Sequence, residues 1–86
     1  MDEDGYAISY QVLPLGTPVR SADGVQLGTV QRVDDNKREN IFDGIVIATP
    51  EGPRFVDAPE VARIAERAVT LTFPASEAAT FLAPVR

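Results

Sequence analysis

The chain of 86 residues contains no cysteine and no histidine. Without cysteine it can form no disulfide, no zinc–thiolate site and no thiol nucleophile. Without histidine it lacks the commonest general base, the commonest metal ligand and the usual partner of a serine nucleophile. The sequence therefore predicts a protein that is not an enzyme and that has no catalytic residues, metal site or cofactor.

Basic residues are also scarce. Eight lysines and arginines stand against thirteen acidic residues, which gives a net charge of −5 and an isoelectric point of about 4.5. Lys37 is the only lysine, and it forms with Arg38 the only adjacent pair of basic residues. Proteins that bind nucleic acid gain most of their affinity by neutralising phosphates. We therefore do not expect a nucleic-acid partner, whereas the charge suits a basic protein.

Long apolar runs are missing as well. No run approaches the roughly 20 residues that cross a bilayer, and the first six residues, MDEDGY, are acidic where a signal peptide is basic. We expect a cytoplasmic protein with no insertion into a membrane. The composition, with 44% apolar and 24% charged residues, is that of an ordinary globular domain. A chain of this length forms one domain, which buries only about 60% of its unfolded surface.

Short extended segments separated by turns dominate the pattern. Residues 17–20 and 25–34 read as a hairpin, with Asp23 and Gly24 in its turn. Within the second segment, Gly28 interrupts the alternation of apolar residues and predicts a β-bulge. Residues 41–49 contain the β-branched run from Ile45 to Ile47, which predicts cover on both faces of that strand. Residues 50–53 close another hairpin before a short strand at 54–56, in which we expect Phe55 to point inward.

Residues 57–67 are ambiguous. Asp57 and Glu60 have the spacing of a capping box, and Pro59 fits a first helical turn. We favour one helical turn over residues 57–60, a short strand over 61–65 and a tight turn at 66–67, but the pattern leaves open whether 61–65 is strand or helix. Residues 68–73 then alternate cleanly as a strand.

The two ends of the chain differ from the middle. We assign residues 1–5 to a disordered acidic tail, residues 6–73 to the folded domain, and residues 74–86 to a short C-terminal helix, capped by Ser76, and a tail. Apolar side chains alternate along an N-terminal extended segment and gather on one side of the helix. They either complete a thin core or form a self-association surface made of Tyr6, Ile8, Tyr10, Val12, Phe81 and Leu82.

One carboxylate stands inside an apolar strand. Asp43 precedes Gly44 in the segment IFDGIVI, where a buried carboxylate would need a basic partner. We predict either an exposed position or an ion pair between Asp43 and Arg54, with Arg20 as the other possible partner.

The ordered combination of these motifs resembles the PRC-barrel domain family, over roughly residues 13–73. The motifs are Gly16-Thr17-Pro18-Val19, Asp23-Gly24, Leu27-Gly28-Thr29-Val30, Phe42-Asp43-Gly44-Ile45-Val46 and Val69-Thr70-Leu71. The details look closest to small stand-alone PRC-barrel proteins of actinobacteria. The resemblance implies a mainly β fold, a small and highly bent antiparallel β-barrel of five to six short strands with a short C-terminal helix. In that frame, structural turns and bulges fall at Gly16, Asp23, Gly24, Gly28, Gly44 and Gly52.

The family shares a binding surface rather than a reaction, so the resemblance implies an interaction module. Our first hypothesis is a non-enzymatic adaptor that forms a homodimer or docks on a protein partner. The alternative is an RNA-processing or ribosome-assembly accessory domain, or a small-ligand-binding barrel. It would use the barrel mouth or a patch of Arg20, Arg32, Arg54 and Arg63.

Overall fold

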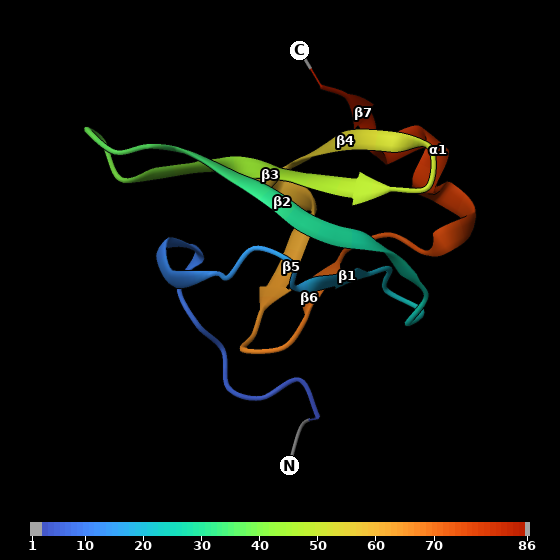
Figure 1. Ribbon diagram of the computed structural model, residues 1–86, viewed down its shortest axis with the longest axis horizontal. Helices are drawn as coiled ribbons and strands as arrows, with labels where there is room; N and C mark the ends of the chain where they lie inside the picture. Colours follow the sequence, from blue (N-terminus) through green and yellow to red (C-terminus); the bar gives the residue numbers. More distant parts are fainter. Residues whose placement is uncertain (1–2, 86) are drawn as a thin grey trace.

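The computed structural model describes residues 3–85 of the chain. Figure 1 shows a single strongly curled sheet with short helical turns at its margins. The strands are β1 (Pro18–Arg20), β2 (Gln26–Asn36), β3 (Ile41–Thr49), β4 (Gly52–Asp57), β5 (Val61–Ile64), β6 (Val69–Leu71) and β7 (Ala83–Pro84). The helical segments are the 3₁₀ turns η1 (Tyr10–Val12), η2 (Ala58–Glu60) and η3 (Ala75–Glu77), and the helix α1 (Ala78–Phe81).

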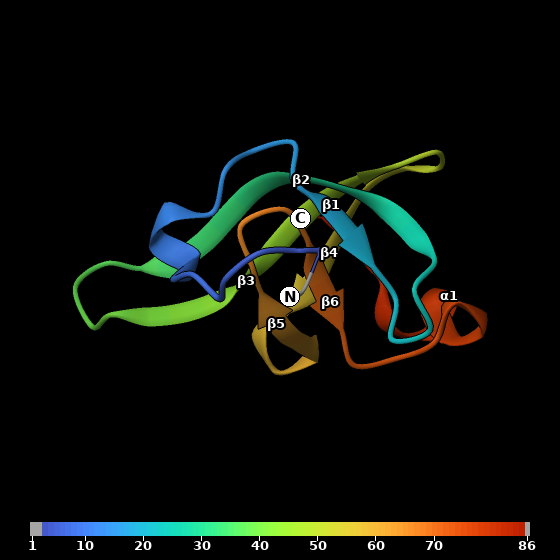
Figure 2. The ribbon, with the colours of Figure 1, turned by 90° about the horizontal axis from the view of Figure 1, so that it is seen from below.

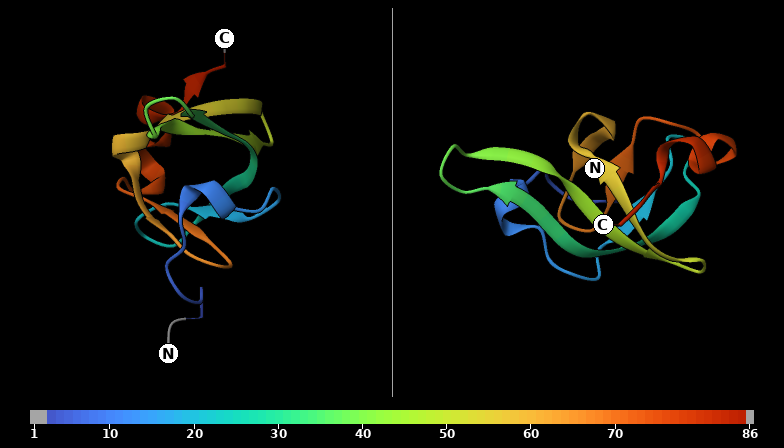
Figure 3. Two further views of the ribbon diagram at one scale, coloured as in Figure 1. Left: turned by 90° about the vertical axis from the view of Figure 1, so that its left-hand side faces the viewer. Right: turned by 90° about the horizontal axis from the view of Figure 1, so that it is seen from above.

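The strands are arranged in the order β5-β6-β1-β2-β3-β4-β7. The predicted mainly β fold, with a small, highly bent sheet and a short C-terminal helix, is confirmed. The sheet has seven strands rather than five or six, and it forms a half-barrel that remains open between its two edge strands. All neighbours are antiparallel except β1 and β6, which run parallel. Figure 3 looks along the curl and shows its open end.

The long hairpin of β2 and β3 is bent by three irregularities in strand pairing. Val19 pairs with Gly28 and Arg20 with Gln26, so Leu27 is the extra residue of a bulge beside Gly28, as predicted. Gln31 and Asp43 are the extra residues of two further bulges between β2 and β3. A bulge bends its strand and increases the local twist, which is how a short sheet curls this tightly.

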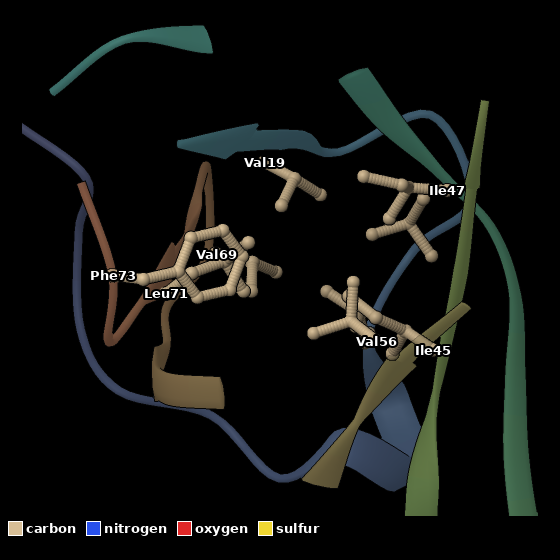
Figure 4. Close-up of a cluster of buried hydrophobic side chains, with 9 residues drawn as sticks. Val19, Ile45, Ile47, Val56, Val69, Leu71 and Phe73 are labelled. Carbon is tan, nitrogen blue, oxygen red and sulfur yellow. The ribbon is translucent and has the colours of Figure 1, made fainter. Parts of the chain in front are cut away.

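The core lies inside the curl. Val19, Ile45, Ile47, Val56, Val69, Leu71 and Phe73, all at most 2% exposed, converge there from four strands and the segment that follows β6 (Figure 4). Val46 is also buried but lies on the outer face, in a row with Arg32 and Phe55 across β2, β3 and β4. The predicted cover on both faces of β3 is therefore confirmed, whereas Phe55 points outward and Val56 takes the inward position.

The ambiguous segment contains a strand. Ala58–Glu60 forms the 3₁₀ turn η2, and Val61–Ile64 forms β5, which pairs with β6. Asp57 occupies the N-cap position without a side-chain capping bond. The Glu60 carboxylate accepts a hydrogen bond from the Thr72 hydroxyl at 2.5 Å. Pairing with β6 makes residues 61–64 a strand, since a segment this short cannot sustain a helix by itself.

Both ends differ from the sequence expectation. Residues 6–12 do not form an extended strand, because only Ala7 makes a bridge, to Ala65, and Tyr10–Val12 winds into η1. Ser76 lies within η3 rather than at a cap, and Pro74 holds the N-cap position. No helix in residues 3–85 is long and apolar enough to cross a membrane.

Four glycines assigned to turns or bends have a positive φ: Gly16, Gly24, Gly44 and Gly52. Gly28 is different, because its φ is not positive and the residue is instead limited to glycine by the closeness of the β3 backbone. A Cβ at Gly28 would lie 2.1 Å from the Ala48 carbonyl oxygen of β3. The absent side chain thus allows the two strands to approach closely at this point.

Candidate interaction surface

Residues 3–16, which we call the arm, run along the lower side of the sheet in Figure 1 and cross that face in Figure 2. The Ile8 N–H donates to the Ile64 carbonyl at 3.0 Å, and the Glu66 N–H donates to the Tyr6 carbonyl at 3.0 Å. The Tyr6 N–H donates in turn to Glu66 Oε1 at 2.9 Å. The arm therefore covers the end of β5, which is one edge of the sheet.

The start of the arm is held by arginines. Asp4 Oδ1 lies 2.7 Å from Arg20 Nη1, and the Asp4 carbonyl accepts the Arg67 N–H at 2.9 Å. Arg63 Nη2 donates to the Gly5 carbonyl at 3.0 Å. Residues 3–5, which the sequence placed in a disordered tail, thus lie against the domain. Residues 1 and 2 of that tail are outside the described residues.

The middle of the arm sits on the β2–β3 hairpin. Ser9 caps η1 by accepting the Gln11 N–H at 3.1 Å. The Tyr10 ring stacks on Phe42 of β3, with 4.7 Å between ring centroids and 18° between planes. Gln11 Nε2 donates to Asn40 Oδ1 at 3.2 Å. An aromatic contact and one amide hydrogen bond therefore join η1 to the hairpin.

Large apolar side chains of the arm remain in water. Tyr6 is 77% exposed, Val12 64% and Leu15 69%, whereas Ile8 and Tyr10 are half-buried. The four alternating residues therefore do not share one face, because the 3₁₀ turn breaks the two-residue period. Sequence reasoning missed Leu15, which stands between Pro14 and Gly16 in a segment with no regular period.

Shallow hollows lie between the arm and the hairpin. One of about 330 Å³ is lined by Gln11, Asp35, Lys37 and Asn40. A neighbouring hollow of about 210 Å³ shares Gln11, Asp35 and Lys37 with the first and is also lined by Tyr10, Leu13, Leu15 and Val33. A third, of about 360 Å³, lies beyond Phe42 and is lined mainly by apolar residues of the arm, η2 and β5. A shallow, partly apolar surface of this kind suits contact with another protein better than it suits enclosure of a small ligand.

The C-terminal members of the expected surface lie elsewhere. Phe81 stacks on the buried Phe73, with 4.8 Å between centroids, and Leu82 packs half-buried against the core. In Figure 1, α1 and η1 lie at opposite ends of the molecule. The structure therefore assigns Phe81 and Leu82 to completing the core and does not bring them together with the arm.

Asp23 links the β1–β2 turn to this C-terminal segment. Its Oδ1 accepts hydrogen bonds from the Ser21 hydroxyl and from the Ala75 N–H, the latter at 3.0 Å. These donors, the Ser21 hydroxyl first, lower the pKa of the Asp23 carboxyl below its ordinary value of 3.8. The turn residue predicted from sequence thus has a second role, in fixing the start of η3.

The candidate ion pair is not formed. Asp43 is exposed at its bulge, while Arg54 lies opposite Ile47, and Arg54 Nη1 donates to the Pro53 carbonyl at 2.8 Å. A different pair occurs on β2. Arg32 Nε and Nη2 donate to the two oxygens of Asp34 at 2.6 and 3.1 Å, which raises the pKa of Arg32. Two-residue spacing on a strand places both side chains on one face, which is the signal that could have found this pair.

The other charged groups do not assemble into a site. Arg20, Arg32, Arg54 and Arg63 lie on four different strands, and Arg32 and Arg54 project from opposite faces of the sheet. Within residues 3–85, no three acidic, histidine or cysteine side chains come together in a group that could hold a metal ion.

Comparison with known proteins adds no relative. No protein-family model matches the chain, and no curated protein matches it significantly. The resemblance to the PRC-barrel domain therefore stays a prediction drawn from the motifs.

Proposed function

We propose that this protein is a non-catalytic protein-interaction module, of the PRC-barrel type, that associates with a second copy of itself. The observation that carries the proposal is the concentration of exposed apolar side chains on the arm. Of the five large hydrophobic residues that are exposed in the described structure, Tyr6, Val12 and Leu15 lie within ten consecutive positions. Single exposed hydrophobics are ordinary, whereas a grouped set marks an interaction site.

The manner in which the arm is attached supports the same proposal. It is held by backbone hydrogen bonds, by the Asp4–Arg20 ion pair and by one aromatic stack, so its position is defined before any partner arrives. A pre-ordered surface loses less conformational entropy on binding. A symmetric dimer is the commonest closed assembly, which makes a second copy the first partner to test.

The first experiment is the solution mass by light scattering on a sizing column, over a range of protein concentrations. We expect a mass of twice the 9.3 kDa of one chain at high concentration. A triple variant, Tyr6→Ser, Val12→Ser and Leu15→Ser, should weaken the dimer. The matched control, Val25→Ser with Ile41→Ser, removes two exposed hydrophobics (46% and 47% exposed) outside the arm and should leave it unchanged.

Two results would count against this function. A mass of one chain at every concentration would refute self-association. A dimer weakened as much by the control variant as by the arm variant would refute the arm as the contact surface. Circular dichroism of each variant would show that the fold is retained.

A further inference from the structure

One stretch of strand β2 has a neighbour on only one side. β1 pairs with β2 as far as Thr29. Val30 bonds to the two residues that come before β1, since the Gly16 N–H donates to the Val30 carbonyl at 2.8 Å and the Val30 N–H donates to the Thr17 carbonyl at 2.9 Å. Residues 31–36 pair with β3 alone. Within residues 3–85 this is the longest stretch of strand with one uncovered side.

The two outermost strands of the sheet are better protected. The arm covers the end of β5 through Ile8 and Tyr6. β7 is only two residues long and contains Pro84, which has no N–H to offer a further strand. The half of β2 that projects with the hairpin is therefore the part of the sheet most able to accept another strand. Figure 3 shows this hairpin extending away from the body of the sheet.

The charges on this stretch have a distinctive order. Arg32 and Asp34 point to the outer face, where they form the ion pair described above, with 56% and 30% of their side chains exposed. Val33 lies between them and faces the inner side, packed against the core and half-buried. The pairing of β2 with β3 is regular from Arg32 to Asp34, and the next register shift falls between Asp34 and Asp35.

We propose that two copies of the protein join their sheets by antiparallel pairing of β2 with β2, about a two-fold axis that passes through Val33. This inference rests on the proposed self-association and names its interface. In this arrangement Arg32 of each copy lies opposite Asp34 of the other, so the two internal ion pairs become one network of four charges.

The neighbouring registers are excluded by charge. Directly opposed residues must lie on the same face of the joined sheet, so the symmetric register can shift only by moving the axis one whole residue at a time. An axis at Arg32 places the two arginines opposite each other, and an axis at Asp34 places the two aspartates opposite each other. Like charges that face each other across strands are destabilising, whereas opposite charges stabilise. The axis at Val33 is the one that places Arg32 and Asp34, which carry opposite charges, across from each other.

The structure also leaves room beside this strand. The hollows lined by Gln11, Val33, Asp35 and Lys37 lie where the inner side chains of the incoming strand would lie. Leu15, which is 69% exposed, lines the hollow that also contains Val33. Its apolar surface would therefore be covered by the partner, which connects this strand pairing to the arm.

Charge reversal tests the register. Arg32→Glu alone and Asp34→Arg alone each turn two opposite-charge contacts into two like-charge contacts. We expect each to raise the dimer Kd by at least about tenfold. An equimolar mixture of the two variants should form a heterodimer of restored affinity, and so should the protein that carries both changes. Arg38→Glu, an equal change of charge at the exposed hairpin tip, is the matched control and should leave the Kd unchanged.

Cross-linking tests the axis. The chain has no cysteine, so Val33→Cys introduces a single thiol that would meet its own counterpart. Opposed residues in an antiparallel pair have Cα atoms about 4.5–5.5 Å apart, a separation that a disulfide spans. Under mild oxidation we expect a covalent dimer in high yield from Val33→Cys, and little from the control Val25→Cys.

The outcomes separate the two proposals. A dimer that persists unchanged in Arg32→Glu and Asp34→Arg, or a Val33→Cys protein that cross-links no better than the control, would overturn the β2 interface and leave self-association standing. Weaker dimers of each single variant, together with restored affinity in the mixture of the two, would establish the register. A wild-type protein that is monomeric at all concentrations would overturn both proposals.

Discussion

Replacement of Gly28 by alanine would place a methyl group where β3 already lies. The new Cβ would be 2.1 Å from the Ala48 carbonyl oxygen and 3.1 Å from its carbon, whereas Cβ atoms do not approach other atoms below 3.0 Å. Because the obstacle is backbone, it cannot rotate aside, and the strands must separate by nearly 1 Å. Overpacking of this kind costs about 3 kcal/mol, and the loss of a nearby strand hydrogen bond adds about 1 kcal/mol.

The resulting loss of about 4 kcal/mol is a large part of the total stability, which is about 4–13 kcal/mol for a domain of this size. It corresponds to a fall in Tm of roughly 15–30 °C. The assay is urea and thermal unfolding followed by circular dichroism. Gly24→Ala is the control, because Gly24 has a φ of +88° but nothing within 4 Å of its Cβ position. Its cost is only the strain of the left-handed conformation, about 1–2 kcal/mol.

The test is whether Gly28→Ala lowers the stability more than Gly24→Ala does. If Gly28→Ala proved no more destabilising than Gly24→Ala, close approach of β2 and β3 would not be the reason for glycine at this position. A correctly folded Gly28→Ala protein with an unchanged Tm would refute the reasoning altogether.

Two further predictions concern the C-terminal segment. Phe73→Ala should cost about 3–5 kcal/mol, and a double-mutant cycle with Phe81→Ala, measured by urea unfolding, should show a coupling of about 0.5–1.5 kcal/mol from their stacking; strictly additive losses would contradict that contact. Asp23→Asn should destabilise the protein at neutral pH, because the lowered pKa shows that the charged carboxylate stabilises the folded state. That contribution is complete above the ordinary value of 3.8 and disappears as the pH falls through the lowered pKa, so the difference between wild type and variant, measured from urea midpoints, should vanish in acid. A difference independent of pH would point to packing instead of charge.

The strands that could be predicted from the sequence are those with a strong local pattern. The segment Ile41–Thr49 contains Ile45, Val46 and Ile47, and a β-branched run of this kind has few alternatives to a strand buried on both faces. The bulge beside Gly28 followed from the broken alternation of its neighbours. These features depend on side-chain period and backbone freedom, which are properties of the residues themselves.

The arm shows where local pattern is insufficient. Its apolar residues alternate as those of a strand do, at Tyr6, Ile8, Tyr10 and Val12. The 3₁₀ turn η1 interrupts this pattern, because Ser9 caps the turn and Tyr10 stacks on Phe42, which is 32 positions away. Exposure of Val12 follows from that turn. The period of two was present in the sequence, but a contact far along the chain overrode it.

The sequence by itself determined the mainly β class, the bent hairpins, the turn at Asp23 and Gly24, and the absence of thiol and imidazole chemistry. These follow from composition and from interactions between near neighbours. Only the tertiary structure decided that β5 is a strand, that Phe81 belongs to the core, that Asp43 and Arg54 stay apart, and that residues 31–36 of β2 have one open side. Each of these depends on which distant segments lie side by side. The local pattern of a segment shows which of its side chains share a face, but it does not show which distant segment pairs with it or in which register.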